Sequence, residues 1–250
     1  MALRKNPLRI VCALLLFAVF AVSAYQIFVL GKEADAQTQL RGDLQVYQPG
    51  AESAGTVQRA AKKNPKISQA QEEINPEIVG WLRIPQTAID YLFVQGTDNI
   101  AYLARDVYGK SAKAGSIFMD YRCAGDFSDF NTILYGHNMK NGSMFRDIRR
   151  FADADFFRAN TAGSLHLPET TLTLDIFAYL LIKADDAVLY RAGDQSMQER
   201  EDFLRYVKQN AKQYRALALS PEDRIVTLST CSYEFSNARM VLLARLRSET

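Results

Sequence analysis

Three residues of this chain have side chains suited to nucleophilic catalysis: Cys231, His137 and Arg239. Cys231 follows the apolar run Ile225–Leu228 and has polar neighbours, so it lies at the end of an expected strand and not in its apolar middle. A thiolate is a strong nucleophile, and a nearby cation favours its formation. Cys231 is therefore a candidate nucleophile. The alternative is a buried structural cysteine, which is usually inert.

His137 is the candidate proton donor for a leaving amine. It comes just after the apolar run Asn131–Tyr135, so it too is expected at the end of a strand. The alternative is an ordinary surface or turn histidine. The second histidine, His166, alternates with Leu165 and Leu167 and is more simply a residue on the face of a barrel strand.

Arg239 opens the final apolar run, Met240–Leu246. If this run pairs with the Cys231 strand as an antiparallel hairpin, Cys231 and Arg239 fall near the same end of the sheet. A guanidinium group there can stabilise a thiolate or an oxyanion and can hold a peptide carbonyl. The alternative is a solvent-facing or ion-paired arginine.

The composition excludes several classes of function. The chain has 250 residues and a formal net charge of +2, which provides no basic field for nucleic acid. Its three cysteines, Cys12, Cys123 and Cys231, form no CxxC pair and no disulfide framework. Neither histidine lies near a cysteine in the sequence, so a zinc site is not expected. We expect no metal and no other cofactor.

The N-terminal region contains an uncharged apolar run, Ile10–Leu30, that is long enough to span a bilayer. Its stronger positive flank, Arg4, Lys5 and Arg9, precedes it. This charge bias predicts a cytoplasmic N-terminus, with the remainder of the chain outside the cell. A cleaved signal peptide is the alternative.

The remainder of the chain must position the three candidate residues. Residues 32–66 are polar and are expected to form a stalk. From residue 78 onward, short apolar or alternating runs are broken by Pro, Gly, Asn and Asp, which predicts a β-barrel or a sandwich. Helices are expected at Ile67–Ile74, Ser143–Phe151 and Ser196–Ala216, the last with a capping box from Ser196 and Glu199.

Several segments together resemble the sortases, and class B sortases in particular. TLSTC at Thr227–Cys231 is similar to the family's TLxTC signature around the nucleophile, and YGH at Tyr135–His137 matches its histidine segment. Arg239 follows the cysteine at the family's hairpin spacing. The segments Gly80–Leu103 and Ala114–Arg122 are also similar to class B enzymes.

The resemblance implies a fold and a domain arrangement. The fold is mainly β: an eight-stranded β-barrel with N-terminal helices, an inserted helix before the cysteine strand, and one N-terminal transmembrane helix. Residues 1–31 would then be a cytoplasmic tip and membrane anchor, 32–66 a stalk, and 67–250 the sortase catalytic domain.

The resemblance also implies a reaction, with Cys231, His137 and Arg239 as its catalytic residues. A sortase cleaves a C-terminal sorting signal after its threonine, forms a thioacyl enzyme, and transfers the protein to an amine. The family's partners are surface proteins with NPxTN-like or related signals and an amine from a peptidoglycan precursor or a pilin. The expected location is the cell membrane, with the catalytic domain outside.

By position, four residues resemble the substrate groove of class B enzymes: Asn99, Leu103, Ser229 and Thr230. The connection around Val188–Leu189 is a further candidate for this groove. Calcium binding belongs to a different class of the family, and no acidic cluster in this chain suggests it.

Two other functions are compatible with the same residues. A cysteine endopeptidase would use the same three side chains, with water as the final acceptor. A surface-anchored binding barrel without catalysis would leave the thiol of Cys231 unreactive. Added amine discriminates the first alternative from a transpeptidase, and a thiol-reactive probe tests the second.

Overall fold

The structure is a computed structural model that describes residues 7–50 and 63–248. The chain divides into two compact units, Met1–Asp43 and Leu44–Thr250. Residues 1–6 of the expected tip and anchor (1–31), residues 51–62 of the expected stalk and residues 249–250 lie outside the described residues.

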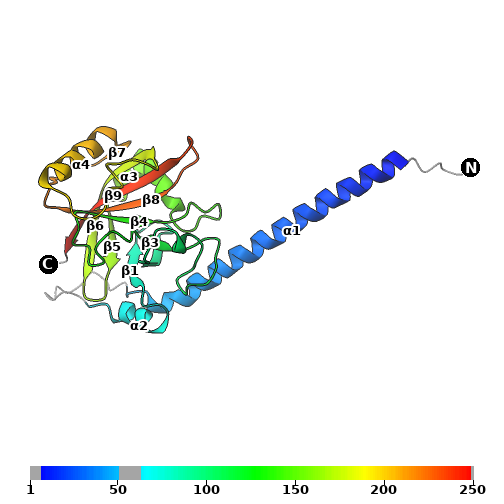
Figure 1. Ribbon diagram of the computed structural model, residues 1–250, viewed down its shortest axis with the longest axis horizontal. Coiled ribbons are helices and arrows are strands. Elements are labelled where there is room, and N and C mark those ends of the chain that lie inside the picture. The colour runs from blue at the N-terminus through cyan, green and yellow to red at the C-terminus, as the bar shows by residue number, and fades with distance from the viewer. Residues whose placement is uncertain (1–6, 51–62, 249–250) are drawn as a thin grey trace, which may run out of the picture. The chain divides into compact units, whose positions relative to one another are not determined.

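The described part of the first unit is the helix α1, Pro7–Leu44 (Figure 1). Within the described residues it is the one helix long and apolar enough to cross a membrane. Large apolar side chains such as Leu16, Phe17 and Phe20 are exposed along it. The helix continues beyond Leu30, where the apolar run ends, so the first part of the expected stalk is helical.

The second unit is a closed β-barrel (Figure 1). Eight strands form a ring in the order β5-β1-β2-β3-β4-β8-β9-β6, and the pairing of β5 with β6 closes it. The short strand β7 pairs with β6 outside this ring. The eight-stranded barrel expected from the sequence is thus confirmed. The strands are β1 Ile78–Arg83, β2 Asp90–Val94, β3 Ile117–Met119, β4 Asn131–Tyr135, β5 Ala162–His166, β6 Thr171–Lys183, β7 Gln213–Tyr214, β8 Arg224–Cys231 and β9 Ala238–Ser248.

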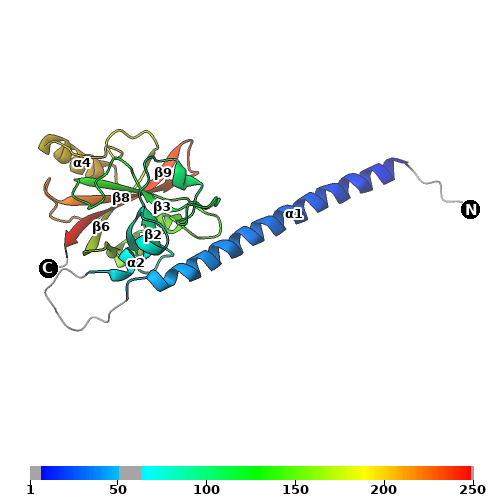
Figure 2. The ribbon, with the colours of Figure 1, turned by 60° about the horizontal axis from the view of Figure 1, so that its bottom comes forward.

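Helices surround the barrel. The helix α2 packs against β1 (Figure 2), and α4 packs against β6 (Figure 1). The helix α4 stands in the connection before the cysteine strand, as expected, and Ser196 and Glu199 form its capping box. The α-helices are α2 Pro65–Glu73, α3 Ala154–Ala159 and α4 Met197–Asn210, and the 3-10 helices are η1 Gln45–Tyr47, η2 Ala101–Leu103 and η3 Arg146–Ala152.

Two expected helices differ from the structure. The segment Ser143–Phe151 was expected to be helical, and the structure has the 3-10 helix η3 in its second half. The last expected helix ends at Asn210, before Ala216, because the chain then pairs Tyr214 with Ala178 of β6.

Alternation along β8 divides its side chains between two apolar clusters. Val226 and Leu228 belong to the cluster that fills the barrel, whereas Ile225 belongs to the cluster beneath α4. Successive side chains of a strand point to opposite faces. Ser229 and Cys231 therefore continue the outer face that begins with Ile225.

Candidate active site

Cys231 and Arg239 lie opposite each other on two adjacent strands. β8 and β9 form an antiparallel hairpin in which Cys231 is the register partner of Arg239. Directly opposite residues of a strand pair place their side chains on the same face. Both residues are half-buried, and Cys231 is a free cysteine. The hairpin thus places both side chains on one face at the same end of the sheet, where Nη1 of Arg239 donates to the Ala238 carbonyl at 3.0 Å.

His137 follows β4, which lies on the other side of β8 from β9. β4 runs parallel to β8, with Tyr135 beside Ser229, and the N–H of Gly136 donates to the Ser229 carbonyl at 3.2 Å. The segment that carries His137 stays beside the end of β8, because the Asn138 side-chain amide donates to the Cys231 carbonyl at 2.8 Å. The ends of β8 and β9 and the segment that follows β4 are therefore neighbours; their residues Cys231, Arg239 and His137 are called the candidate catalytic row below.

A carbonyl orients the His137 ring. Nε2 of His137 lies 2.8 Å from the Leu103 carbonyl oxygen. A carbonyl only accepts hydrogen bonds, so Nε2 is the nitrogen that carries the proton. In a neutral ring Nδ1 is then the basic nitrogen.

Glycine is required at position 136 by close packing. A Cβ atom there would lie 2.5 Å from Cδ1 of Ile117 and 2.9 Å from the ring of Phe145. A side chain at this position would push the His137 segment away from β3. The glycine of the YGH segment therefore allows His137 to lie where it does.

The structure separates the four substrate-groove candidates. Ser229 shares the outer face of β8 with Cys231, and its hydroxyl lies 2.7 Å from that of Tyr190. Thr230 is buried on the opposite face, and its Oγ1 makes no hydrogen bond to any described residue. Its side chain therefore does not line the surface that carries Cys231.

Asn99 and Leu103 lie on one segment at the His137 side of the site. The Asn99 Oδ1 accepts a hydrogen bond from the Tyr121 N–H at 3.1 Å, which ties this segment to the end of β3. Leu103 ends η2, its side chain is 41% exposed, and its carbonyl reaches His137. Leu103 is thus adjacent to the candidate catalytic row.

This geometry agrees with the comparisons with known proteins. A sequence model of the sortase family, described as Sortase domain, matches residues 82–247. The chain belongs to the sortase family. Sortase B of Listeria monocytogenes is 36% identical over 177 residues, which cover 70% of this chain and 72% of that protein.

Solved structures place the chain among the class B sortases. Sortase B of B. anthracis superposes with a TM-score of 0.76 at 29% identity and covers 87% of this chain and 99% of its own. A Streptococcus pyogenes class B sortase involved in pilus biogenesis has a TM-score of 0.66 at 30% identity, covering 72% of this chain and 97% of its own. Family membership makes this chain a sortase-type cysteine transpeptidase.

The connection Val188–Arg191, between β6 and α4, lies beside the outer face of β8 and is called the wall below. The sequence suggested it only around Val188–Leu189. The Asn131 amide donates to the carbonyls of Leu189 at 3.0 Å and Arg191 at 3.3 Å. This anchoring sets Tyr190 over Ser229.

Tyr190 lies close enough to Arg239 and Cys231 for their charges to influence its pKa. Burial raises the pKa of Tyr190 to about 12, although the Ser229 hydroxyl and the positive charge of Arg239 act in the opposite direction. Tyr190 therefore stays a neutral hydrogen-bonding group at neutral pH. The sequence offered one signal for the anchor: Asn131 is a polar residue at the start of an apolar run.

The buried carboxylate of Asp120 is linked to the wall through Tyr135. Asp120 accepts hydrogen bonds from the Arg122 side chain at 2.7 and 2.9 Å and from the Tyr135 hydroxyl at 3.0 Å. The Tyr135 ring stacks on Tyr190, with centroids 6.2 Å apart. Burial works against the ionised form of Asp120, but the hydrogen bonds from Arg122 and Tyr135 hold its pKa below the usual value.

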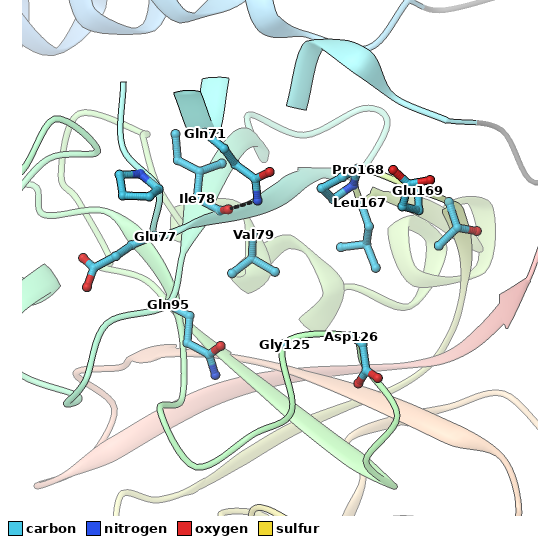
Figure 3. Close-up of a pocket in the computed structure, with 12 residues that line it drawn as sticks. Gln71, Glu77, Ile78, Val79, Gln95, Gly125, Asp126, Leu167, Pro168 and Glu169 are labelled. Carbon is cyan, nitrogen blue, oxygen red and sulfur yellow. Dashed lines mark hydrogen bonds between the residues drawn. The ribbon is translucent and has the colours of Figure 1, made fainter. Parts of the chain in front are cut away.

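A cleft lies beside the start of β1 and the end of β2 (Figure 3). It has a volume of about 480 Å³, and Glu77, Val79, Gln95 and Asp126 are among the residues that line it. Gln95 follows the end of β2, and β2 runs parallel to β3 but opposite to β4. This end of β2 therefore points away from His137, and none of the three candidate catalytic residues lines the cleft.

Within the described residues, no three His, Cys, Asp or Glu side chains gather where they could hold a metal ion. Both ring nitrogens of His166 face hydroxyl groups, Nε2 that of Ser164 at 2.9 Å and Nδ1 that of Thr171 at 3.1 Å. His166 thus serves the packing of β5 against β6.

Proposed function

We propose that this sortase uses Cys231 as its nucleophile, His137 as its proton donor and Arg239 as its oxyanion-stabilising cation. One observation supports the proposal: Cys231 and Arg239 are register partners on β8 and β9, and the segment after β4 that carries His137 is hydrogen-bonded to the end of β8 on both sides of His137. A nucleophile needs both a nearby cation and a proton-transfer partner, and this row provides both.

The reaction follows from the roles of the three residues. The Cys231 thiolate attacks the carbonyl carbon of the scissile peptide bond, and Arg239 donates to the oxyanion of the tetrahedral intermediate. Protonated His137 gives its proton to the leaving amine, and the C–N bond breaks to leave a thioacyl enzyme. An incoming amine then attacks the thioester, gives its proton to His137, and releases Cys231 as the thiolate.

The substrates are surface proteins with a C-terminal sorting signal, NPxTN-like or related. Asn99, Leu103 and Ser229 border the row and are proposed to contact the signal. Thr230 would contribute through its backbone, because its side chain faces the barrel interior. The acceptor is an amine of a peptidoglycan precursor or a pilin; the similarity to a class B sortase involved in pilus biogenesis supports the second source.

The sortase acts at the outer surface of the cell membrane. The apolar helix α1 supports a single-pass anchor within residues 1–31, with a stalk at 32–66 and the catalytic domain at 67–250. Positive residues precede the apolar run, which favours a cytoplasmic N-terminus.

The experiment that tests this function follows peptide cleavage by the full chain in detergent micelles. A panel of sorting-signal peptides is incubated with and without an added amine, and the products are identified by mass spectrometry. We expect cleavage after threonine, a thioacyl adduct on Cys231, and an amide product when amine is present. Hydrolysis alone at every amine concentration would favour the endopeptidase. Failure of a thiol probe to label Cys231 would favour a non-catalytic barrel.

A further inference from the structure

The hydrogen-bond ladder between β4 and β8 ends just before the catalytic row. Its last backbone rung runs from the Gly136 N–H to the Ser229 carbonyl. Rungs of a parallel ladder recur every two residues. The next one would therefore run from the N–H of residue 138 to the carbonyl of Cys231, and it would fix His137 beside Cys231.

A side chain makes this connection. The Asn138 side-chain amide, through Nδ2, donates to the Cys231 carbonyl at 2.8 Å. The backbone itself turns away, because Asn138 forms an isolated bridge with Met144 and the Phe145 N–H donates to the His137 carbonyl at 3.0 Å. The chain therefore changes direction after His137, while the Asn138 side-chain amide still connects this segment to β8.

The orientation of the Asn138 amide follows from its two partners. Its Oδ1 accepts from the Arg146 guanidinium at 2.9 Å, and its Nδ2 faces the Cys231 carbonyl. A guanidinium only donates and a carbonyl only accepts, so the reversed amide would leave both contacts unmade. Asn138 is 8% exposed, so water does not readily replace either partner.

We infer that Asn138 is a positioning residue for the sortase reaction, with Arg146 holding its amide in place. The inference rests on the proposed roles of Cys231 and His137. Asn138 touches the backbone of Cys231, not the surface that carries its thiol. It sets the separation of nucleophile and proton donor, on which proton transfer depends steeply. Its loss should therefore slow the chemical steps and leave peptide binding nearly unchanged.

The test compares two variants of Asn138 in the full chain in detergent. Asn138→Asp keeps the size and the acceptor for Arg146 but cannot donate to the Cys231 carbonyl, and Asn138→Ala removes both contacts. We expect kcat on one sorting peptide to fall about 10-fold or more in both, with KM within about twofold of wild type. Asn141→Ala, in the same segment, is the matched control and should keep the wild-type kcat.

Arg146 provides a test of conservative rescue. Arg146→Lys keeps a cationic donor for the Asn138 Oδ1, and Arg146→Met does not. We expect Arg146→Met to lower kcat at unchanged KM, and Arg146→Lys to recover at least half of the wild-type kcat. A residue with only a packing role would give no such difference between the two variants.

The outcomes separate this inference from the proposed function. The positioning role would be overturned by a wild-type kcat in Asn138→Asp or by a rise in KM alone. If both Asn138 variants fail to fold, a wild-type kcat in Arg146→Met would overturn it instead. Cys231→Ala is measured in parallel. Full activity in that variant would overturn the proposed function, whereas an inactive Cys231→Ala beside active Asn138 variants would reject only the role of Asn138.

Discussion

Two free cysteines of the barrel unit, Cys123 and Cys231, have contrasting surroundings. Cys123 is 5% exposed, and its Sγ lies 3.7 Å from the Asn131 carbonyl oxygen, to which the thiol donates. Cys231 is half-buried at the end of β8, opposite Arg239. Burial raises the pKa of Cys123 to about 11, and the charge of Asp120 acts in the same direction. At pH 7 Cys123 is therefore almost entirely in its thiol form.

The contrast shows that its surroundings decide what a cysteine can do: Cys123 is buried in the connection between β3 and β4, whereas Cys231 ends β8. Both cysteines lie close to β4 or its neighbour β8, yet Cys123 belongs to the apolar cluster that fills the barrel, whereas Cys231 is the register partner of Arg239. A strand that ends at its cysteine leaves the thiol accessible while the barrel holds its backbone. The predictions below test this contrast, beginning with the largest expected effect.

Replacing the two cysteines separately should give opposite results. Cys231→Ala removes the proposed nucleophile and should lower cleavage of a sorting peptide by at least about a thousandfold, with the fold intact. The measurement is product formation followed by chromatography, with circular dichroism on the same sample. Loss of activity in Cys123→Ala alone would contradict the assignment of Cys231.

Arg239 should tolerate lysine poorly. A lysine keeps the positive charge but loses the planar fork of donors. If Arg239 donates directionally to the oxyanion, both Arg239→Lys and Arg239→Ala should lower kcat/KM by about 10²-fold, as for loss of one oxyanion donor. Steady-state kinetics on one sorting peptide gives both values.

The lysine variant also distinguishes two roles for the charge. If Arg239 acts only through space on the thiol, Arg239→Lys should retain most of the activity that Arg239→Ala loses. Near wild-type activity in both variants would remove Arg239 from the catalytic row.

Asp120 should matter for stability, and the effect should depend on pH. Asp120→Asn weakens the hydrogen bonds from Arg122 and Tyr135 and should lower the free energy of unfolding by about 1–3 kcal/mol at pH 7. The pKa of Asp120 is lower in the folded state than its unfolded value of about 4. The contribution is therefore present above that unfolded value and is lost as the pH falls through the lowered pKa.

Urea unfolding at pH 7 and at pH 3 measures this dependence. From pH 7 to pH 3 the wild-type protein should lose more free energy of unfolding than Asp120→Asn. The difference in free energy of unfolding between the two proteins should therefore be smaller at pH 3. An equal difference at both pH values would show that ionisation of Asp120 does not support the wall beside Cys231.

The sequence could predict the strand ends near the candidate catalytic row because strand ends follow from local patterns. Apolar runs locate β4, β8 and β9, and their polar ends carry His137, Cys231 and Arg239. The side-chain hydrogen bonds that hold these strand ends together could not be predicted from the sequence. The Asn138 amide meets Cys231 only because the chain turns after His137, and no periodicity reports such a turn.

Helical spacing was also ambiguous in one segment. Phe145, Ile148 and Phe151 recur every three residues, which a 3-10 helix of three residues per turn satisfies as well as an α-helix. All three are buried, so residues at this spacing form a stripe that faces the core. It did not determine which kind of helix carries them.

The smallest effect is expected for Cys123 itself. Cys123→Ala removes one buried sulfur and should cost about 1 kcal/mol of stability, with kcat/KM within about twofold of wild type. In the native protein at pH 8, iodoacetamide should label Cys231 at least about a hundred times faster than Cys123, because the buried thiol with its raised pKa is seldom ionised. Mass spectrometry of the digested protein distinguishes the labelled peptides, and labelling in urea serves as the control in which Cys123 is accessible. Comparable labelling of both cysteines in the native protein would show that burial does not protect Cys123, and the contrast between the two sites would then lie in Arg239 and His137 alone.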